Sequence, residues 1–84
     1  MTEQNLCLYT LSTCIHCKHA KAFLELHNIK YKLVCADALV PAERKAVMEE
    51  VLKYNPRLSF PTLVVDGGKD VIVGFNEEKY QGLI

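Results

Sequence analysis

The hydrophobic period changes twice between residues 5 and 35, and this change constrains the fold more than any other feature of the chain. Residues 5–10, "NLCLYT", form a short run of strand formers that is apolar on both faces, as in a central parallel strand. Residues 15–27 then show helical spacing, and Asn28 suits a left-handed helix end. Residues 30–35, "KYKLVC", return to a strand pattern. We therefore expect a right-handed βαβ unit, which takes about 30 residues or more.

The second half of the chain predicts one further helix, a hairpin and a short final helix. A helix is expected from Pro41 to the Asn55-Pro56 pair, because proline suits a first helical turn and disfavours helix in the residue before it. The apolar stripe of this helix is Val47, Met48, Val51 and Leu52. "TLVVD" and "DVIVG" flank Gly67-Gly68-Lys69, which indicates an antiparallel hairpin. The last helix is expected from about Asn76.

These elements follow the order β-α-β-α-β-β-α, which predicts an α/β fold with a mixed four-stranded sheet and helices on both faces. Residues 1–84 contain neither a linker-like stretch nor a repeat, so we expect one domain. Ten basic residues balance ten acidic ones, which argues against nucleic-acid binding. The sequence shows no secretory leader and no membrane-spanning run, so a cytoplasmic protein without a membrane partner is expected.

The pair Cys14 and Cys17 stands where the first strand gives way to the helix, in "STCIHCKHA". Unpaired amides and the helix dipole favour negative charge at this place, so Cys14 is expected to ionise more readily than a free thiol. Cys17 follows about one helical turn later, where its sulfur can return to that of Cys14 while remaining more covered. His16 is the candidate tuning residue, and Lys18, His19 and Lys21 add positive charge nearby.

Other uses of the four cysteines remain open. A structural zinc site needs four ligands, usually from two separated pairs, and the sequence has no second CxxC, so no metal is expected. Small metal carriers also place CxxC after a first strand, which leaves a metal-carrier function as an alternative. We expect Cys7 to be a packed core thiol in the first strand. Cys35, at the carboxyl end of the second strand, is either structural or a secondary redox thiol.

The CxxC pair at the start of a helix, together with Phe60-Pro61-Thr62 before the third strand, resembles the thioredoxin superfamily and, at this length, the glutaredoxins. The resemblance implies a thioredoxin-like fold, a cis peptide bond before Pro61 and a dithiol-disulfide oxidoreductase. Cys14 would be the nucleophile and Cys17 the resolving thiol of a Cys14–Cys17 redox disulfide. The Phe60 backbone would pair with an extended thiol substrate. The substrate-binding residues implied in this way are Thr13, Ile15, Phe60, Pro61, Gly74 and Phe75.

The site also departs from the pattern of many glutathione-dependent glutaredoxins. The chain has Cys14-Ile15-His16-Cys17 in place of CPYC, no lysine shortly before the pair, and "VGFNEE" instead of Gly-Gly with acidic residues after the fourth strand. Glutathione is therefore a candidate co-substrate that is expected to bind weakly, with Arg57 and Lys18 as partial replacements. No tightly bound cofactor is expected.

The Gly74-Phe75 step instead resembles the short electron donors of ribonucleotide reductase, which implies a thioredoxin-reductase-type flavoenzyme as the reductant. In that interpretation Phe75 serves as an exposed aromatic anchor. Protein disulfides are the expected substrates, and the expected state is a monomer. The alternative function is an iron-sulfur cluster carrier in which the Cys14 thiolates of two chains and two glutathiones hold the cluster.

Overall fold

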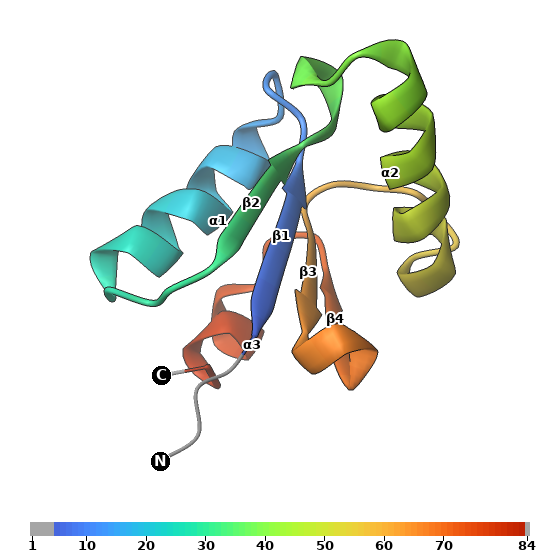
Figure 1. The fold of residues 1–84 in the computed structure, drawn as a ribbon. Helices are drawn as coiled ribbons and strands as arrows, with labels where there is room; N and C mark the ends of the chain where they lie inside the picture. The colour runs from blue at the N-terminus through green and yellow to red at the C-terminus, as the bar shows by residue number, and fades with distance from the viewer. Residues whose placement is uncertain (1–4, 84) are drawn as a thin grey trace.

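The protein folds around a sheet of four strands, seen in a computed structural model that describes residues 5–83 (Figure 1). Its strands and longer helices alternate along the first part of the chain, as the periodicity predicts. The elements are β1 (Leu6–Thr10), α1 (Ile15–Leu26), β2 (Lys32–Cys35), η1 (Ala36–Ala38), α2 (Pro41–Tyr54), β3 (Thr62–Val65), η2 (Asp66–Gly68), β4 (Asp70–Val73) and α3 (Glu77–Gln81).

The strand order in the sheet is β2-β1-β3-β4. β1 and β2 pair in parallel on either side of the α1 crossover, whereas β1 with β3 and β3 with β4 pair antiparallel. This pairing confirms the predicted mixed four-stranded sheet. The helices lie on both of its faces, as predicted, with α1 and α3 on one face and α2 on the other (Figure 1). Asn28 has a φ of 55° after the end of α1, which is the left-handed conformation that its side chain tolerates.

The core lies between the sheet and the two helices α1 and α3, which cover the same face (Figure 1). Alternation along β1 directs Leu6 and Leu8 to this face, and the buried residues of α1 meet them there. Tyr80 of α3 closes the cluster and is fully buried. The cluster consists of Leu6, Leu8, Ala20, Phe23, Leu24, Leu63, Val65, Ile72 and Tyr80.

α2 lies across the opposite face of the sheet and covers it less completely (Figure 1). Val51 is its one fully buried side chain, while Val47 and Met48 are half-buried. Leu52 is 48% exposed, so its expected place in the buried stripe is wrong. The reason is the direction of the helix, since the stripe turns away from the sheet one residue after Val51. No helix within residues 5–83 has both the length and the apolar character needed to cross a bilayer.

The hairpin between β3 and β4 contains two glycines with positive φ, Gly67 at 70° and Gly68 at 113°. A Cβ atom on Gly68 would lie 2.8 Å from the ring of Tyr54, so the missing side chain lets this turn pack directly on the end of α2. Asp66 also bonds both backbone groups of Asn5, with its N–H donating to the Asn5 carbonyl at 2.7 Å and its carboxylate accepting from the Asn5 N–H at 2.9 Å.

Candidate functional site

Cys14 is the N-cap residue of α1, where its extended backbone (φ −86°, ψ 117°) leads from the loop after β1 into the helix. Its Sγ accepts a hydrogen bond from the backbone N–H of Cys17 at 3.3 Å. The first turn carries no acidic side chain that would compete for these amides. An amide donor at a helix start stabilises negative charge on sulfur. Cys14 is half-buried, so its sulfur combines this donor with access from solvent.

Cys17 is its buried partner, with 1% of its surface exposed. Burial, and secondarily its hydrogen bond with Cys14, raises the pKa of the Cys17 thiol to about 12. Cys17 therefore stays protonated at neutral pH while Cys14 carries the accessible sulfur. The prediction that Cys17 is the more covered of the two thiols is confirmed, and both cysteines are free.

The Phe60–Pro61 step, which directly precedes β3, lies against Cys14. Its peptide bond is cis, and the Phe60 carbonyl accepts a hydrogen bond from Cys14 Sγ at 3.7 Å. The Pro61 carbonyl accepts from the N–H of Gly74 at 2.8 Å, and Gly74 has a φ of 75°. Four of the sequence-predicted site residues, Cys14, Phe60, Pro61 and Gly74, are thus brought together although they lie far apart in the chain.

A buried polar network centred on Asn55 positions the segment that carries Phe60. The Asn55 side chain is 1% exposed, and its Nδ2 donates to the Ser59 carbonyl at 2.9 Å, to Ser59 Oγ at 3.1 Å and to Thr62 Oγ1 at 3.0 Å. Its Oδ1 accepts from the Arg57 N–H at 3.1 Å. Thr62 Oγ1 in turn donates to the Ser59 carbonyl at 2.7 Å. Sequence reasoning identified Asn55 only as a helix end, since no local pattern reports these partners.

A second polar contact holds the loop immediately before Cys14. The carboxylate of Asp37 accepts from the Ser12 N–H at 3.0 Å and from Ser12 Oγ at 2.5 Å. These bonds, and a further one from the thiol of Cys35 at 3.0 Å, lower the pKa of Asp37 to about 2. The hydrogen bond to Asp37, followed by burial, raises the pKa of the Cys35 thiol. Neither Ser12 nor Asp37 was predicted to matter, because 25 residues separate them.

The remaining predicted site residues lie on the rim. Thr13, Ile15 and His16 have exposed side chains, and Ile15 is 57% exposed beside Cys14. The ring of His16 meets that of His19 edge-on with centroids 6.3 Å apart. Phe75 differs from the prediction of an exposed anchor. It is half-buried, because its ring packs against those of Phe23 and Tyr80 at centroid distances of 6.1 and 5.0 Å.

The other two cysteines occupy opposite faces of the sheet. Cys35 shares a hollow of about 210 Å³ with Cys17 and Thr10 at the end of the sheet where Cys14 lies. Cys7 is half-buried on the α2 face, so its prediction as a packed core thiol is wrong. The strand alternation that buries Leu6 and Leu8 under α1 directs Cys7 to the less completely covered side. Within residues 5–83, no three or more His, Cys, Asp or Glu side chains are grouped so that they would hold a metal ion.

The mixed four-stranded sheet, with helices on both faces and a CxxC pair at the start of α1, has the architecture of the thioredoxin-like fold. The Glutaredoxin family model matches residues 6–69, and the chain belongs to the glutaredoxin family. The glutaredoxin of Archaeoglobus fulgidus is 35% identical with a TM-score of 0.86, covering 94% of this chain and 84% of that one. Methanoredoxin of Methanosarcina acetivorans is 32% identical with a TM-score of 0.89, over 94% of this chain and 82% of that one.

A curated relative, prostaglandin E synthase 2 of Danio rerio, is 32% identical over 66 residues, which are 79% of this chain. This chain spans 15% of the length of that relative. The similarity therefore concerns one region of a much longer protein.

Proposed function

We propose that the protein is a dithiol-disulfide oxidoreductase that reduces protein disulfides or glutathione mixed disulfides through Cys14 and Cys17. The observation that carries this proposal is the inequality of the two thiols. Cys14 is accessible, accepts an amide hydrogen bond and faces the Phe60 backbone, while Cys17 is buried with a raised pKa. Family membership supports thiol-disulfide chemistry in general.

In the proposed reaction the Cys14 thiolate attacks one sulfur of the substrate disulfide. A Cys14–substrate disulfide forms, the substrate S–S bond breaks, and the first substrate thiolate leaves and takes a proton. Cys17 then loses its proton and attacks Cys14 Sγ, which closes the Cys14–Cys17 disulfide and releases the second substrate thiolate. The charge on Cys14 is among the causes that raise the pKa of Cys17, so forming the mixed disulfide removes one obstacle to its ionisation.

The test compares Cys14→Ser with Cys17→Ser. The first variant should lose disulfide reduction, whereas the second should accumulate a mixed disulfide that mass spectrometry detects and should retain activity toward glutathionylated substrates. Cys7→Ser and Cys35→Ser are the matched controls and should retain activity. Rapid alkylation near neutral pH should label Cys14 first. Faster labelling of Cys7 or Cys35 would contradict the assignment.

A thioredoxin-reductase-type flavoenzyme is the proposed reductant, with glutathione as a weaker one. The missing lysine and Gly-Gly-acidic segment support this preference, while Lys18 and Arg57 are exposed and available to a glutathione carboxylate. Because Phe75 is packed, docking would rest on Ile15 and the Phe60 and Gly74 backbone. NADPH consumption by the oxidised protein should be faster with thioredoxin reductase than with glutathione and glutathione reductase. The opposite order would overturn the preference.

The protein is further proposed to act as a cytoplasmic monomer without a tightly bound cofactor. Cluster carriage by two chains is the alternative outcome. Anaerobic reconstitution with iron, sulfide and glutathione should leave the protein colourless and monomeric in gel filtration. A coloured dimer that lacks disulfide reductase activity would favour the carrier function.

A further inference from the structure

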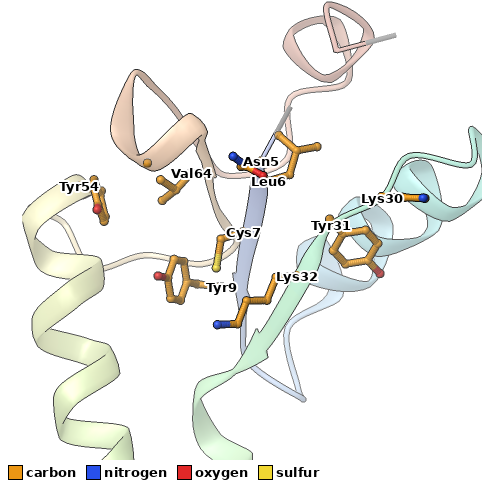
Figure 2. A pocket seen from close by; sticks show the side chains of 10 residues that line it. Asn5, Leu6, Cys7, Tyr9, Lys30, Tyr31, Lys32, Tyr54 and Val64 are labelled. Atoms are coloured by element: carbon orange, nitrogen blue, oxygen red, sulfur yellow. The ribbon is translucent and has the colours of Figure 1, made fainter. Parts of the chain in front are cut away.

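A hollow of about 520 Å³ lies on the α2 face of the sheet (Figure 2), and neither Cys14 nor Cys17 is among the residues that line it. It exists because α2 buries only Val51 fully, so that the side chains of this helix do not fill the space over the neighbouring part of the sheet. Gly67 borders the hollow and adds no side chain to fill it. Its volume falls within the range of about 300–1,000 Å³ that is usual for small-molecule sites.

The floor of the hollow is set by the strand register. Cys7 of β1 pairs with Lys32 of β2 on one side and with Val64 of β3 on the other. Paired residues of neighbouring strands point to the same face, so an ammonium group, a thiol and an apolar side chain lie in one row across the sheet. All three line the hollow. The row therefore runs from a cation at the β2 edge to apolar surface over β3.

Aromatic rings form the walls. Tyr9 follows Cys7 along β1 on the same face, and Tyr54 comes from the end of α2 (Figure 2). The ring of Tyr54 is held by the hairpin turn, because a Cβ on Gly68 would lie 2.8 Å from it. Burial, and then hydrogen bonding with Cys7, raises the pKa of Tyr9, so its hydroxyl remains a neutral donor. These rings give the hollow two apolar faces with polar tips.

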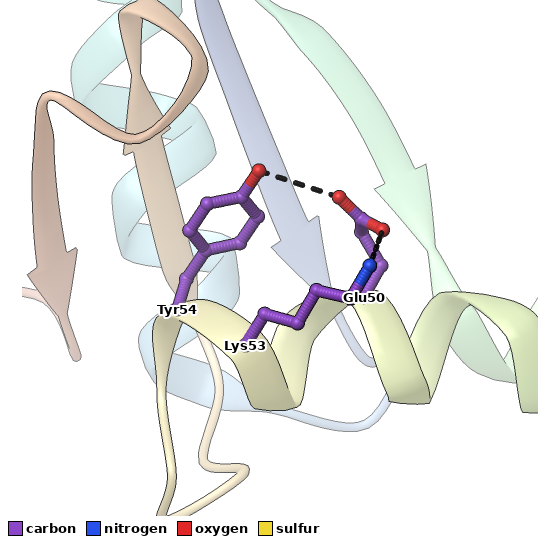
Figure 3. A network of polar contacts seen from close by, with 3 residues as sticks. All are labelled: Glu50, Lys53 and Tyr54. Atoms are coloured by element: carbon purple, nitrogen blue, oxygen red, sulfur yellow. Dashed lines mark hydrogen bonds and ion pairs between the residues drawn. The ribbon is translucent and has the colours of Figure 1, made fainter.

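The charged side chains near the hollow determine where a charged group of a ligand would lie. Lys32 forms no ion pair among residues 5–83, where the single ion pair joins Lys53 to Glu50 at 3.5 Å. Glu50 also accepts a hydrogen bond from the Tyr54 hydroxyl at 3.3 Å, which places its negative charge at the α2 side (Figure 3). Lys30 also lines the hollow, whereas the charge of Glu50 is offset by Lys53. An anionic group is therefore favoured at the side of Lys32 and Lys30.

We propose that this hollow binds a small organic anion with a flat apolar body. The anionic group meets Lys32, and the body lies over Cys7 and Val64 between the rings of Tyr9 and Tyr54. The site is separate from the dithiol site, since Cys7 faces α2 whereas Cys17 and the buried core of α1 lie on the other face of the sheet.

The test uses two probes with similar aromatic bodies, anilinonaphthalenesulfonate and the uncharged phenylnaphthylamine, titrated into the reduced full chain and followed by fluorescence. The sulfonate should bind saturably at one site and more tightly than the uncharged probe. Lys32→Met should weaken sulfonate binding about threefold, as expected for a partly exposed ion pair, and should leave the uncharged probe unchanged. Lys45→Met, on the exposed side of α2, is the matched control and should affect neither probe.

Amide NMR spectra of the unmodified protein locate the probe independently of any variant. Shifts that centre on Cys7, Tyr9, Lys32 and Val64 support the proposal. Shifts centred on Cys14, Ile15 and Phe60, an absence of saturable binding, or sulfonate binding that is insensitive to Lys32→Met would each overturn it.

Discussion

The two faces of the sheet are built in different ways. Beneath α1 and α3 the residues are apolar and interlocked, with Leu8, Leu24, Leu63 and Tyr80 fully buried. Beneath α2 the contacts are Val51, the Asn55 polar network and a hollow lined by Cys7. The face beneath α1 and α3 therefore supplies most of the apolar burial. The face beneath α2 positions the segment that carries Phe60 and leaves a hollow on the sheet.

The candidate site lies where both faces contribute. The face beneath α1 and α3, called the apolar face, holds α1 and hence Cys14 and Cys17 against the end of β1. The face beneath α2, called the polar face, holds the segment before β3, whose Phe60 carbonyl contacts Cys14 Sγ. Chemistry at Cys14 therefore depends on two supports of different physical nature, and variants that affect one support at a time should separate them.

The largest expected difference between the faces is in stability. Leu24→Ala removes a fully buried side chain from the apolar cluster and should lower the free energy of unfolding by about 2–5 kcal/mol. Leu52→Ala on α2 is the matched control, because Leu52 is 48% exposed, and should stay within about 0.5 kcal/mol of the parent. Urea denaturation measures both. Equal losses would show that the two faces are packed alike.

Asn55→Ala should break the support on the polar face. It removes the Asn55 donor from Ser59 and Thr62, which keep only the bond between Thr62 Oγ1 and the Ser59 carbonyl, and it removes the acceptor of the Arg57 N–H; this should cost about 1–3 kcal/mol of unfolding free energy. The rate of disulfide reduction should also fall, because the Phe60 segment loses its anchor. Ser59→Ala, which removes only the Oγ acceptor, should cost less in both measurements. A stability loss without any change in rate would mean that the network does not position Phe60.

Tyr80→Phe tests the buried hydroxyl group that Tyr80 places in the apolar cluster. The Tyr80 hydroxyl is buried without a hydrogen-bond partner among residues 5–83, and burial raises the pKa of this phenol. Removing the hydroxyl should raise the free energy of unfolding by about 1 kcal/mol, because its desolvation is uncompensated. Tyr54→Phe, whose hydroxyl donates to Glu50, should instead have a neutral or slightly destabilising effect. A destabilised Tyr80→Phe protein would indicate that the hydroxyl is satisfied.

The smallest expected effect concerns Asp37, which ties the loop before Cys14 to the segment after β2. Its pKa is lowered from 3.8 to about 2, so its contribution to stability is present above the unfolded-state value and is lost as the pH falls from 3.8 through 2. Asp37→Asn should flatten the decline in unfolding free energy over this range. Ser12→Ala should flatten it partly, since the Ser12 N–H remains. An unchanged slope in Asp37→Asn would contradict the shift.

The sequence by itself determined the elements and the position of the CxxC pair, because these depend on patterns within a few residues. The two changes of period identified β1, α1 and β2, the Gly67-Gly68 turn identified the hairpin, and the place of Cys14 at a helix start followed directly. The likeness of Phe60-Pro61-Thr62 to its family was also readable without coordinates.

Tertiary structure alone decided how those elements meet. The directions of Leu52 and Phe75 depend on how a helix and a loop lie against the sheet. The contact of Ser12 with Asp37 joins groups that no local pattern relates. Cys7 has the same neighbours in sequence whether its side of the sheet is filled or open, and it is the incomplete coverage by α2 that leaves it half-buried beside a hollow. The hydrophobic period specifies which residues share a face of a helix or strand. How completely that face is covered depends on the distance between neighbouring elements, and the sequence pattern carries no information about that distance.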